Sequence, residues 1–151
     1  MAIGHVPAQI DVTAQLRTAG LRVTAPRKAV LTWLAGHPHA TADEVRAGVA
    51  AELGSVSHQT VYDVLRAGCD AGLVRVIEPA GLPALFERRT GDNHHHVVCR
   101  GCGRTQDVDC VQGRAPCLSP DDDQGFTVDE AEILFWGLCP ICRSNHHEER
   151  R

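Results

Sequence analysis

Four cysteines arranged as two CxxC pairs are the residues of this chain whose types and spacing point most directly to chemistry. The pairs are Cys99/Cys102 and Cys139/Cys142. A CxxC turn presents two thiolates to one ion, and two such turns supply the four ligands of a tetrahedral zinc site. Because four thiolates leave no open coordination position, we expect a structural zinc ion. The 36 residues between the pairs are more than a zinc ribbon usually has.

Three consecutive histidines, His94, His95 and His96, lie just ahead of the first CxxC pair. On a strand, His94 and His96 project to one face and His95 to the other. Two imidazoles on one face can share a second metal ion of borderline hardness, such as Fe(II), Mn(II) or Zn(II), and oxygen ligands would favour Fe(II) or Mn(II). Candidates for the remaining ligands are Glu87, Asp107 and His39. An isolated histidine is, however, more often a cap or a surface residue.

Helix signals dominate the first half of the chain. A helix that contains Leu16 stops at Gly20, and three later helices start at polar caps: Thr24, Thr41 and Ser57. The second of these caps forms a capping box with Glu44. Two short strands, residues 73–77 and 84–87, follow around a turn rich in Pro and Gly. Three or four helices followed by a hairpin are the layout of a winged helix-turn-helix domain.

The fourth predicted helix opens with small polar side chains, where helix-turn-helix proteins contact base edges. Although the net charge is −4, residues 12–42 contain basic and no acidic residues, which suits phosphate contact. The candidate DNA-binding residues are Arg17, Arg22, Arg27, Ser57, His58, Gln59, Thr60, Tyr62 and Arg66. The alternative is a solvated helix face and a helix start that touches only water.

Composition limits the class of protein. The 151 residues include seven cysteines but only 4% aromatics, so metal crosslinks could replace part of a small core. No apolar run approaches the length of a membrane span, and no secretory signal is visible. We therefore expect a cytoplasmic protein whose cysteines bind metal rather than form disulfides.

The second half predicts a smaller and more acidic domain. Residues 1–90 carry nine basic and eight acidic side chains, whereas residues 91–151 carry six and eleven. Strands are predicted at 94–99 and 105–108, a loop at 111–125, and a strand pair or one bent strand at 126–138. The expected organisation is a DNA-binding domain at 1–87, a hinge at 88–93, a dimerisation and metal-binding domain at 94–143, and a disordered tail at 144–151. Cys110 and Cys117 could form a thiol switch if exposed, or be buried or merely solvated.

Taken together, the motifs resemble those of the Fur family of bacterial metalloregulators. The resemblance spans roughly residues 12–143 and rests on Thr24-x-Pro26-Arg27, Thr60-Val61-Tyr62, His94-His95-His96-Val-Val-Cys99-x-x-Cys102-Gly103 and Cys139-x-x-Cys142. A narrower likeness, to the actinobacterial FurA/CatR branch that neighbours the PerR peroxide sensors, lies in residues 91–96 and around Cys110 and Cys117. Asp63 stands where many relatives have Arg, and Ala131 where a further His ligand often falls.

The resemblance implies an α+β protein with an N-terminal winged helix and a C-terminal α/β dimerisation domain. It implies a structural Zn²⁺ on the four paired cysteines and a regulatory Fe²⁺ or Mn²⁺, for which Zn²⁺ could substitute. That ion would be bound by His39, Glu87, His94, His96 and Asp107. The implied protein is not an enzyme but a homodimeric repressor that binds palindromic operator DNA when metal is present.

The resemblance also suggests the signal. Asp107 occupies the position where peroxide sensors tend to carry Asp and iron sensors Glu, which implies peroxide-responsive control of a catalase or catalase-peroxidase gene through oxidation of a ligand histidine. An iron-uptake or zinc regulator without peroxide sensing is the alternative. Two rivals from other classes are a zinc hydrolase, which would need an open coordination position and a nearby general base, and a zinc-stabilised interaction module without regulation.

Overall fold

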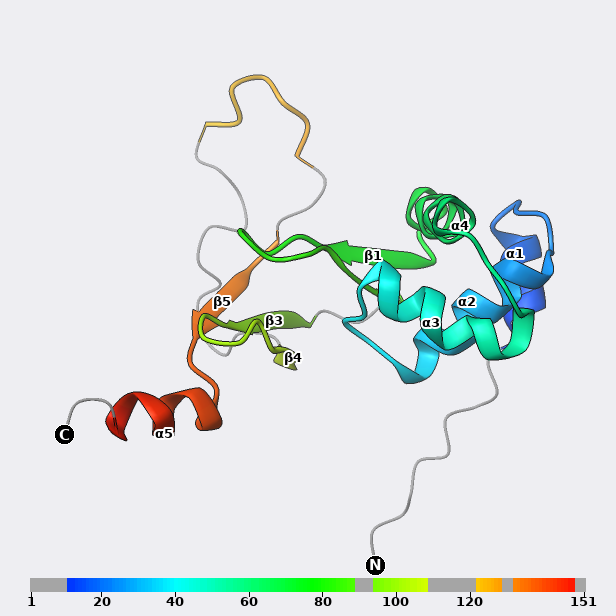
Figure 1. The fold of residues 1–151 in the computed structure, drawn as a ribbon. Coiled ribbons are helices and arrows are strands. Elements are labelled where there is room, and N and C mark those ends of the chain that lie inside the picture. Colours follow the sequence, from blue (N-terminus) through cyan, green and yellow to red (C-terminus); the bar gives the residue numbers. More distant parts are fainter. Residues whose placement is uncertain (1–10, 89–93, 109–121, 129–131, 149–151) are drawn as a thin grey trace, which may run out of the picture. The chain divides into compact units, whose positions relative to one another are not determined.

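A computed structural model of the chain describes residues 11–88, 94–108, 122–128 and 132–148 (Figure 1). The chain divides into two compact units, Met1–Thr90 and Gly91–Arg151. The order of elements, helices first and a small sheet afterwards, confirms the predicted α+β class.

The first unit consists of four helices followed by a hairpin. The helices are α1 (Val12–Thr18), α2 (Ala25–Gly36), α3 (Ala42–Leu53) and α4 (His58–Asp70). Two short antiparallel strands, β1 (Val74–Ile77) and β2 (Leu85–Arg88), complete it. The last three helices pack against one another, and β1 packs on α4. The winged helix-turn-helix layout predicted from the sequence is therefore present.

The helices begin where the polar caps predicted them. The hydroxyls of Thr24, Thr41 and Ser57 each accept a hydrogen bond from a backbone N–H in the following turn. At α3 the capping box is complete, because Glu44 also accepts the backbone N–H of Thr41 at 2.7 Å. The chain leaves α4 through Gly72, whose φ of +70° lies in the left-handed region that favours glycine.

Apolar side chains from the helices and the hairpin form one core in the first unit. Leu16, Leu34, Leu65 and Val45 are almost completely buried in it, and Phe86 contributes from β2. Val45 and Val49 both face inward from α3. A backbone bridge between Ala40 and Phe86 ties the segment after α2 to β2, with N–H···O distances of 3.1 and 2.7 Å.

The second unit is built on a three-stranded sheet in the order β4-β3-β5. Its strands are β3 (His95–Cys99), β4 (Thr105–Val108) and β5 (Leu134–Gly137). Strand β3 pairs antiparallel with β4 and parallel with β5. Helix α5 (Pro140–Glu148) follows β5 directly (Figure 1).

Three boundaries differ from the sequence prediction. Arg88 is the buried last residue of β2 rather than the first residue of a hinge, because its backbone pairs with Val74. In the predicted strand region 126–138, only Leu134–Gly137 is a strand, since only these residues pair with β3. Residues 144–148, predicted as disordered tail, continue helix α5, which the Ser144 hydroxyl supports by donating to the carbonyl of Pro140. The predicted hinge at 89–93 and loop at 111–121 lie outside the described residues.

None of the helices in the described ranges combines the length and the apolar character needed to cross a bilayer.

Candidate metal centres and nucleic-acid interface

The four paired cysteines converge in the second unit. Cys99 ends β3 and Cys102 lies in the following turn, while Cys139 and Cys142 flank the start of α5. The parallel pairing of Cys99 with Gly137 places the second CxxC pair beside the first. The four sulfur atoms lie within 4.8 Å of one another. The tertiary structure therefore unites two pairs that are far apart in sequence.

The spacing of the sulfurs fits a zinc ion. Sulfurs at about 2.3 Å from a tetrahedral zinc are separated by about 3.8 Å. The Sγ atoms of Cys102 and Cys139 lie 3.8 Å apart. Gly101 makes the approach of the two turns feasible, because a Cβ at this position would lie 2.9 Å from the Cys142 sulfur. The donor set and its geometry both match a structural four-thiolate site.

Hydrogen bonding prepares this cluster for a cation. The backbone N–H of Cys139 donates to the Cys99 sulfur at 3.2 Å and, against the opposing effect of burial, lowers the pKa of that thiol to about 6. The neighbouring sulfurs, that of Cys139 first, raise the pKa of Cys142 to about 12, because hydrogen bonding to them favours its protonated form. A fully deprotonated cluster thus requires a positive charge at its centre, which a zinc ion would supply.

The first unit pairs one histidine with one carboxylate. The Nε2 atom of His39 lies 3.1 Å from Oε2 of Glu87, and both side chains are largely buried. The Ala40–Phe86 bridge brings the two together, because each is the neighbour of a bridged residue. His39 has a φ of +60°, which is strained for a residue other than glycine. Strained backbone of this kind is concentrated at functional sites.

The second unit brings His94, His96 and Asp107 together. Asp107 Oδ1 lies 3.6 Å from Nε2 of His94 and 3.4 Å from Nε2 of His96. His96 pairs directly with Asp107 across β3 and β4, and its side chain is fully buried. The His95 ring lies elsewhere, edge-on to Phe135 at 6.3 Å. The prediction that His94 and His96 share one face and His95 takes the other is confirmed.

Each of these two sets combines imidazole nitrogen with carboxylate oxygen. Such mixed donors suit Fe(II), Mn(II) or Zn(II) better than softer ions. In the set of the second unit, the Asp107 carboxylate is half-exposed and accessible to solvent. In the set of the first unit, the Glu87 carboxylate is almost entirely buried. Within each unit, the structure thus assembles a part of the predicted regulatory ligand set.

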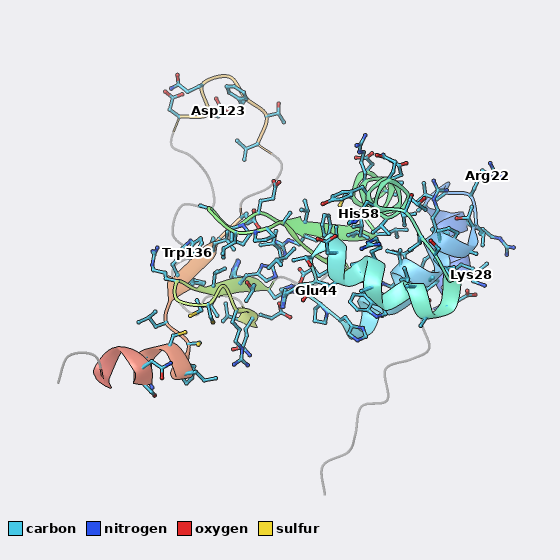
Figure 2. The ribbon with its side chains drawn as sticks, in the orientation of Figure 1. Arg22, Lys28, Glu44, His58, Asp123 and Trp136 are labelled. Carbon is cyan, nitrogen blue, oxygen red and sulfur yellow. The ribbon has the colours of Figure 1, made fainter. Side chains whose placement is uncertain are left out.

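Most of the candidate DNA-binding residues lie on α4 or just before it, in the first unit. Arg22, Arg27 and Thr60 line a shallow pocket of about 320 Å³ between the start of α2 and α4. Arg22 extends from the loop before α2, and His58 stands at the first residue of α4 (Figure 2). The Tyr62 side chain is half-exposed. Arg17 and Arg66 are exposed on α1 and α4 but do not line this pocket.

The polar side chains at the start of α4 have partners that the sequence did not predict. The Ser57 and Thr60 hydroxyls lie 2.8 Å apart. His58 Nδ1 lies 3.2 Å from Asp43 of α3, and the Gln59 amide donates to Asp63 at 2.8 Å. The spacing of four between Gln59 and Asp63 was a signal available in the sequence. The Asp43–His58 pair depends on how α3 and α4 pack, so no signal in the sequence could have predicted it.

The structure also shows the surroundings of a further cysteine and of two acidic residues. Cys69 packs against the core, and burial, followed by the nearby Asp70 charge, raises the pKa of its thiol. Cys110 and Cys117 lie outside the described residues. Asp122 and Asp123 are exposed and accept backbone N–H groups of the turn that follows them.

Comparisons with known proteins agree on one family. The model described as "Ferric uptake regulator family" matches residues 18–133. The transcriptional regulator FurA of Mycobacterium tuberculosis is 56% identical over 132 residues, which cover 87% of this chain and 90% of the relative. The peroxide-responsive repressor PerR of Staphylococcus aureus is 30% identical over 131 residues, covering 86% and 88%. The solved ferric uptake regulator of Pseudomonas aeruginosa with manganese is 28% identical and has a TM-score of 0.65, covering 87% of this chain and 99% of that one.

Proposed function

The chain belongs to the ferric uptake regulator family, and on this premise we propose that it represses transcription as a homodimer bound to a palindromic operator when a regulatory Fe(II) or Mn(II) ion is present. Family membership itself makes it a metal-dependent transcriptional regulator and not an enzyme. The zinc hydrolase considered from the sequence is therefore wrong.

The observation that carries the proposal is the occurrence of histidine and carboxylate ligands in two incomplete sets. His39 with Glu87 offers two donors, and His94 with His96 and Asp107 offers three. Ions such as Fe(II) and Mn(II) take about six donors in an octahedral site, so neither set is sufficient alone. Only six residues separate Glu87 from His94 in the chain. All five side chains bind one ion in the proposed repressor.

The ligand sets explain how metal would control DNA binding. Ligands from both units would fix one angle between them in each protomer. In a two-fold dimer this angle sets the separation of the two α4 helices, which must match half-sites about one helical turn apart. The DNA-competent arrangement gains population because it alone offers all five ligands. Helix α4 would then read the operator in the cytoplasm.

The structural ion that we assign to Cys99, Cys102, Cys139 and Cys142 is Zn²⁺. Its support is the tetrahedral sulfur spacing, together with the backbone N–H groups that stabilise thiolate at Cys99. This site holds the second unit together and has no open position for chemistry. It is separate from the regulatory set, which consists of nitrogen and oxygen donors.

The signal in this proposal is peroxide, and the regulated gene encodes a catalase or catalase-peroxidase. Support comes from the aspartate at position 107 and from the 30% identity to a peroxide-responsive repressor. The competing signal is iron itself, or zinc, without peroxide sensing. The relatives named ferric uptake regulation protein, one of them 57% identical, favour this alternative.

The first experiment separates regulated DNA binding from a mere interaction module. Zinc-retaining protein is stripped of regulatory metal, reloaded with Mn(II), and titrated onto duplexes selected from a random pool. Mn(II) should tighten binding strongly in the wild type, and H96A should lose this response. The matched control is H95A, whose ring lies on the opposite face of β3. Equal responses in H96A and the wild type would contradict the proposal.

The second experiment tests the signal. Fe(II) reduces peroxide by one-electron chemistry that can oxidise a bound ligand, whereas Mn(II) does so far less readily. Peroxide should abolish DNA binding of the Fe(II) form and add oxygen to a histidine-containing peptide in mass spectrometry. The Mn(II) form should keep both its affinity and its mass. Equal sensitivity of DNA binding in the two forms would count against metal-catalysed oxidation of a ligand histidine.

A further inference from the structure

Gln59 and Asp63 form a pair on the exposed side of α4, and the proposed function gives this pair no specific role. Gln59 is the second residue of α4, and its Nε2 donates to Oδ1 of Asp63, one turn further on, at 2.8 Å. Both side chains are exposed. A carboxylate can only accept hydrogen bonds, so its presence requires the nitrogen of the amide to face Asp63. The orientation of the Gln59 side chain is thereby determined.

The other polar side chains of this turn are also held by partners. The Ser57 hydroxyl accepts the backbone N–H of Thr60 at 3.0 Å and lies 2.8 Å from its hydroxyl. His58 lies 3.2 Å from the carboxylate of Asp43. The start of α4 therefore presents side chains whose positions are set before any ligand arrives.

Resting on the proposed function, in which α4 enters the major groove, we propose that Gln59 reads an adenine of the operator and that Asp63 is the residue that positions it. The Gln59 amide has two N–H hydrogens and one carbonyl oxygen. Asp63 takes one hydrogen, which leaves the other hydrogen and Oε1. These two groups match N7 and the N6 amino group of adenine, the pairing that glutamine makes in the major groove.

The charge of Asp63 would oppose DNA binding if nothing compensated for it. Asp63 lines the same pocket as Arg22 and Arg27, whose guanidinium groups supply two positive charges. Phosphate binding therefore remains feasible beside an acidic residue. Because the carboxylate repels phosphates at every sequence equally, it also lowers non-specific affinity. Asp63 thus favours discrimination between bases over total affinity.

The experiment uses the full-length, Mn(II)-loaded protein and duplexes selected from a random pool by the wild type. Each base pair of the selected duplex is then changed in turn, and the ratio of affinities is measured for Q59A, D63A and D63N. D63N is the critical variant, because asparagine keeps an oxygen that can accept from Gln59 while losing the charge. D70N is the control, because Asp70 is an exposed acid at the other end of the same helix.

The wild type should prefer A·T at one position of each half-site by about tenfold or more, and Q59A should lose this preference. In D63A the preference should fall by about two- to tenfold, which is the usual effect of freeing one immobilised side chain. D63N and D70N should retain the preference. Both Asp63 variants should bind unrelated duplexes more tightly than the wild type does.

Three results would overturn the inference while leaving the proposed function intact. In the first, Q59A keeps the base preference of the wild type at every position. In the second, D63A discriminates between bases as well as the wild type does. In the third, D63N loses as much of the A·T preference as D63A does. A protein that enriches no duplex in the presence of metal would instead contradict the proposed function, and this inference with it.

Discussion

The two units of this chain are stabilised in different ways. The first has a continuous core to which four helices and a hairpin contribute. In the described part of the second, the buried apolar side chains are Val98 and Cys99, and the third buried residue is His96. Because the described part of the second unit buries so few apolar side chains, we expect it to need crosslinks, which a zinc ion on the four-cysteine cluster would provide. The comparison teaches that an apolar core stabilises the first unit, whereas in the proposed regulator a metal ion would stabilise the second.

The largest difference in stability between the two units should follow from the loss of one proposed zinc ligand. C102S should release zinc and unfold the second unit, because structural zinc contributes about 10 kcal/mol or more to such folds. The chain has two tryptophans, and Trp33 reports on the first unit and Trp136 on the second. Single-tryptophan variants should show a changed Trp136 signal and an unchanged Trp33 signal.

The control for this prediction is C69A, since Cys69 packs beside the core of the first unit. It should retain a full equivalent of zinc. A C102S protein with native zinc content and an unaltered Trp136 spectrum would show that the cluster does not hold the second unit together.

The reverse test removes core from the first unit. L34A deletes a side chain that is 1% exposed and should lower the free energy of unfolding by about 2–5 kcal/mol. Urea titration followed by Trp33 fluorescence measures this loss, and zinc content should not change. L82A, in the exposed turn of the hairpin, is the matched control with a small effect. Similar losses for both leucines would refute the assigned core.

A smaller effect is expected at the capping box of α3. Thr41 exchanges two hydrogen bonds with Glu44, at 3.2 and 2.7 Å, and T41A should cost about 1 kcal/mol. Because Thr41 follows the bridge that positions His39, T41A should also weaken Mn(II) binding slightly. T32A, an exposed threonine within α2, controls for the substitution itself. Thermal unfolding measures the loss of stability, and calorimetric titration measures the affinity for Mn(II). A T41A protein as stable as the wild type would contradict the prediction.

The smallest expected effect is a difference in thiol reactivity between Cys69, in the first unit, and the proposed metal-binding cysteines of the second. Burial, followed by the charge of Asp70, raises the pKa of Cys69. Its thiol therefore stays protonated to higher pH than a free cysteine does, and alkylation at pH 8 should be slow. D70N should speed the reaction modestly by removing the negative charge. Peptide mapping of the alkylated, zinc-loaded protein gives the rate, and reaction as fast as that of free cysteine would contradict this reasoning.

Much of the local structure could be predicted because local chemistry determines it. Thr24, Thr41 and Ser57 mark helix starts, since a hydroxyl satisfies an otherwise unpaired N–H within one turn. The alternation of His94, His95 and His96 followed from the period of a strand. The helix over 144–148 was missed, because its residues lack the apolar spacing on which helix prediction depends.

The sequence by itself determined the chemistry available to this protein: two thiolate pairs, a histidine run, carboxylates nearby and a capped polar helix start. Only the tertiary structure decided which of these groups meet. The Ala40–Phe86 bridge joins His39 to Glu87 across 48 positions, and the parallel pairing of β3 with β5 joins the two CxxC turns. The reason is that capping and strand alternation depend on neighbours in the chain, whereas long-range pairing depends on how buried surfaces of whole elements fit together.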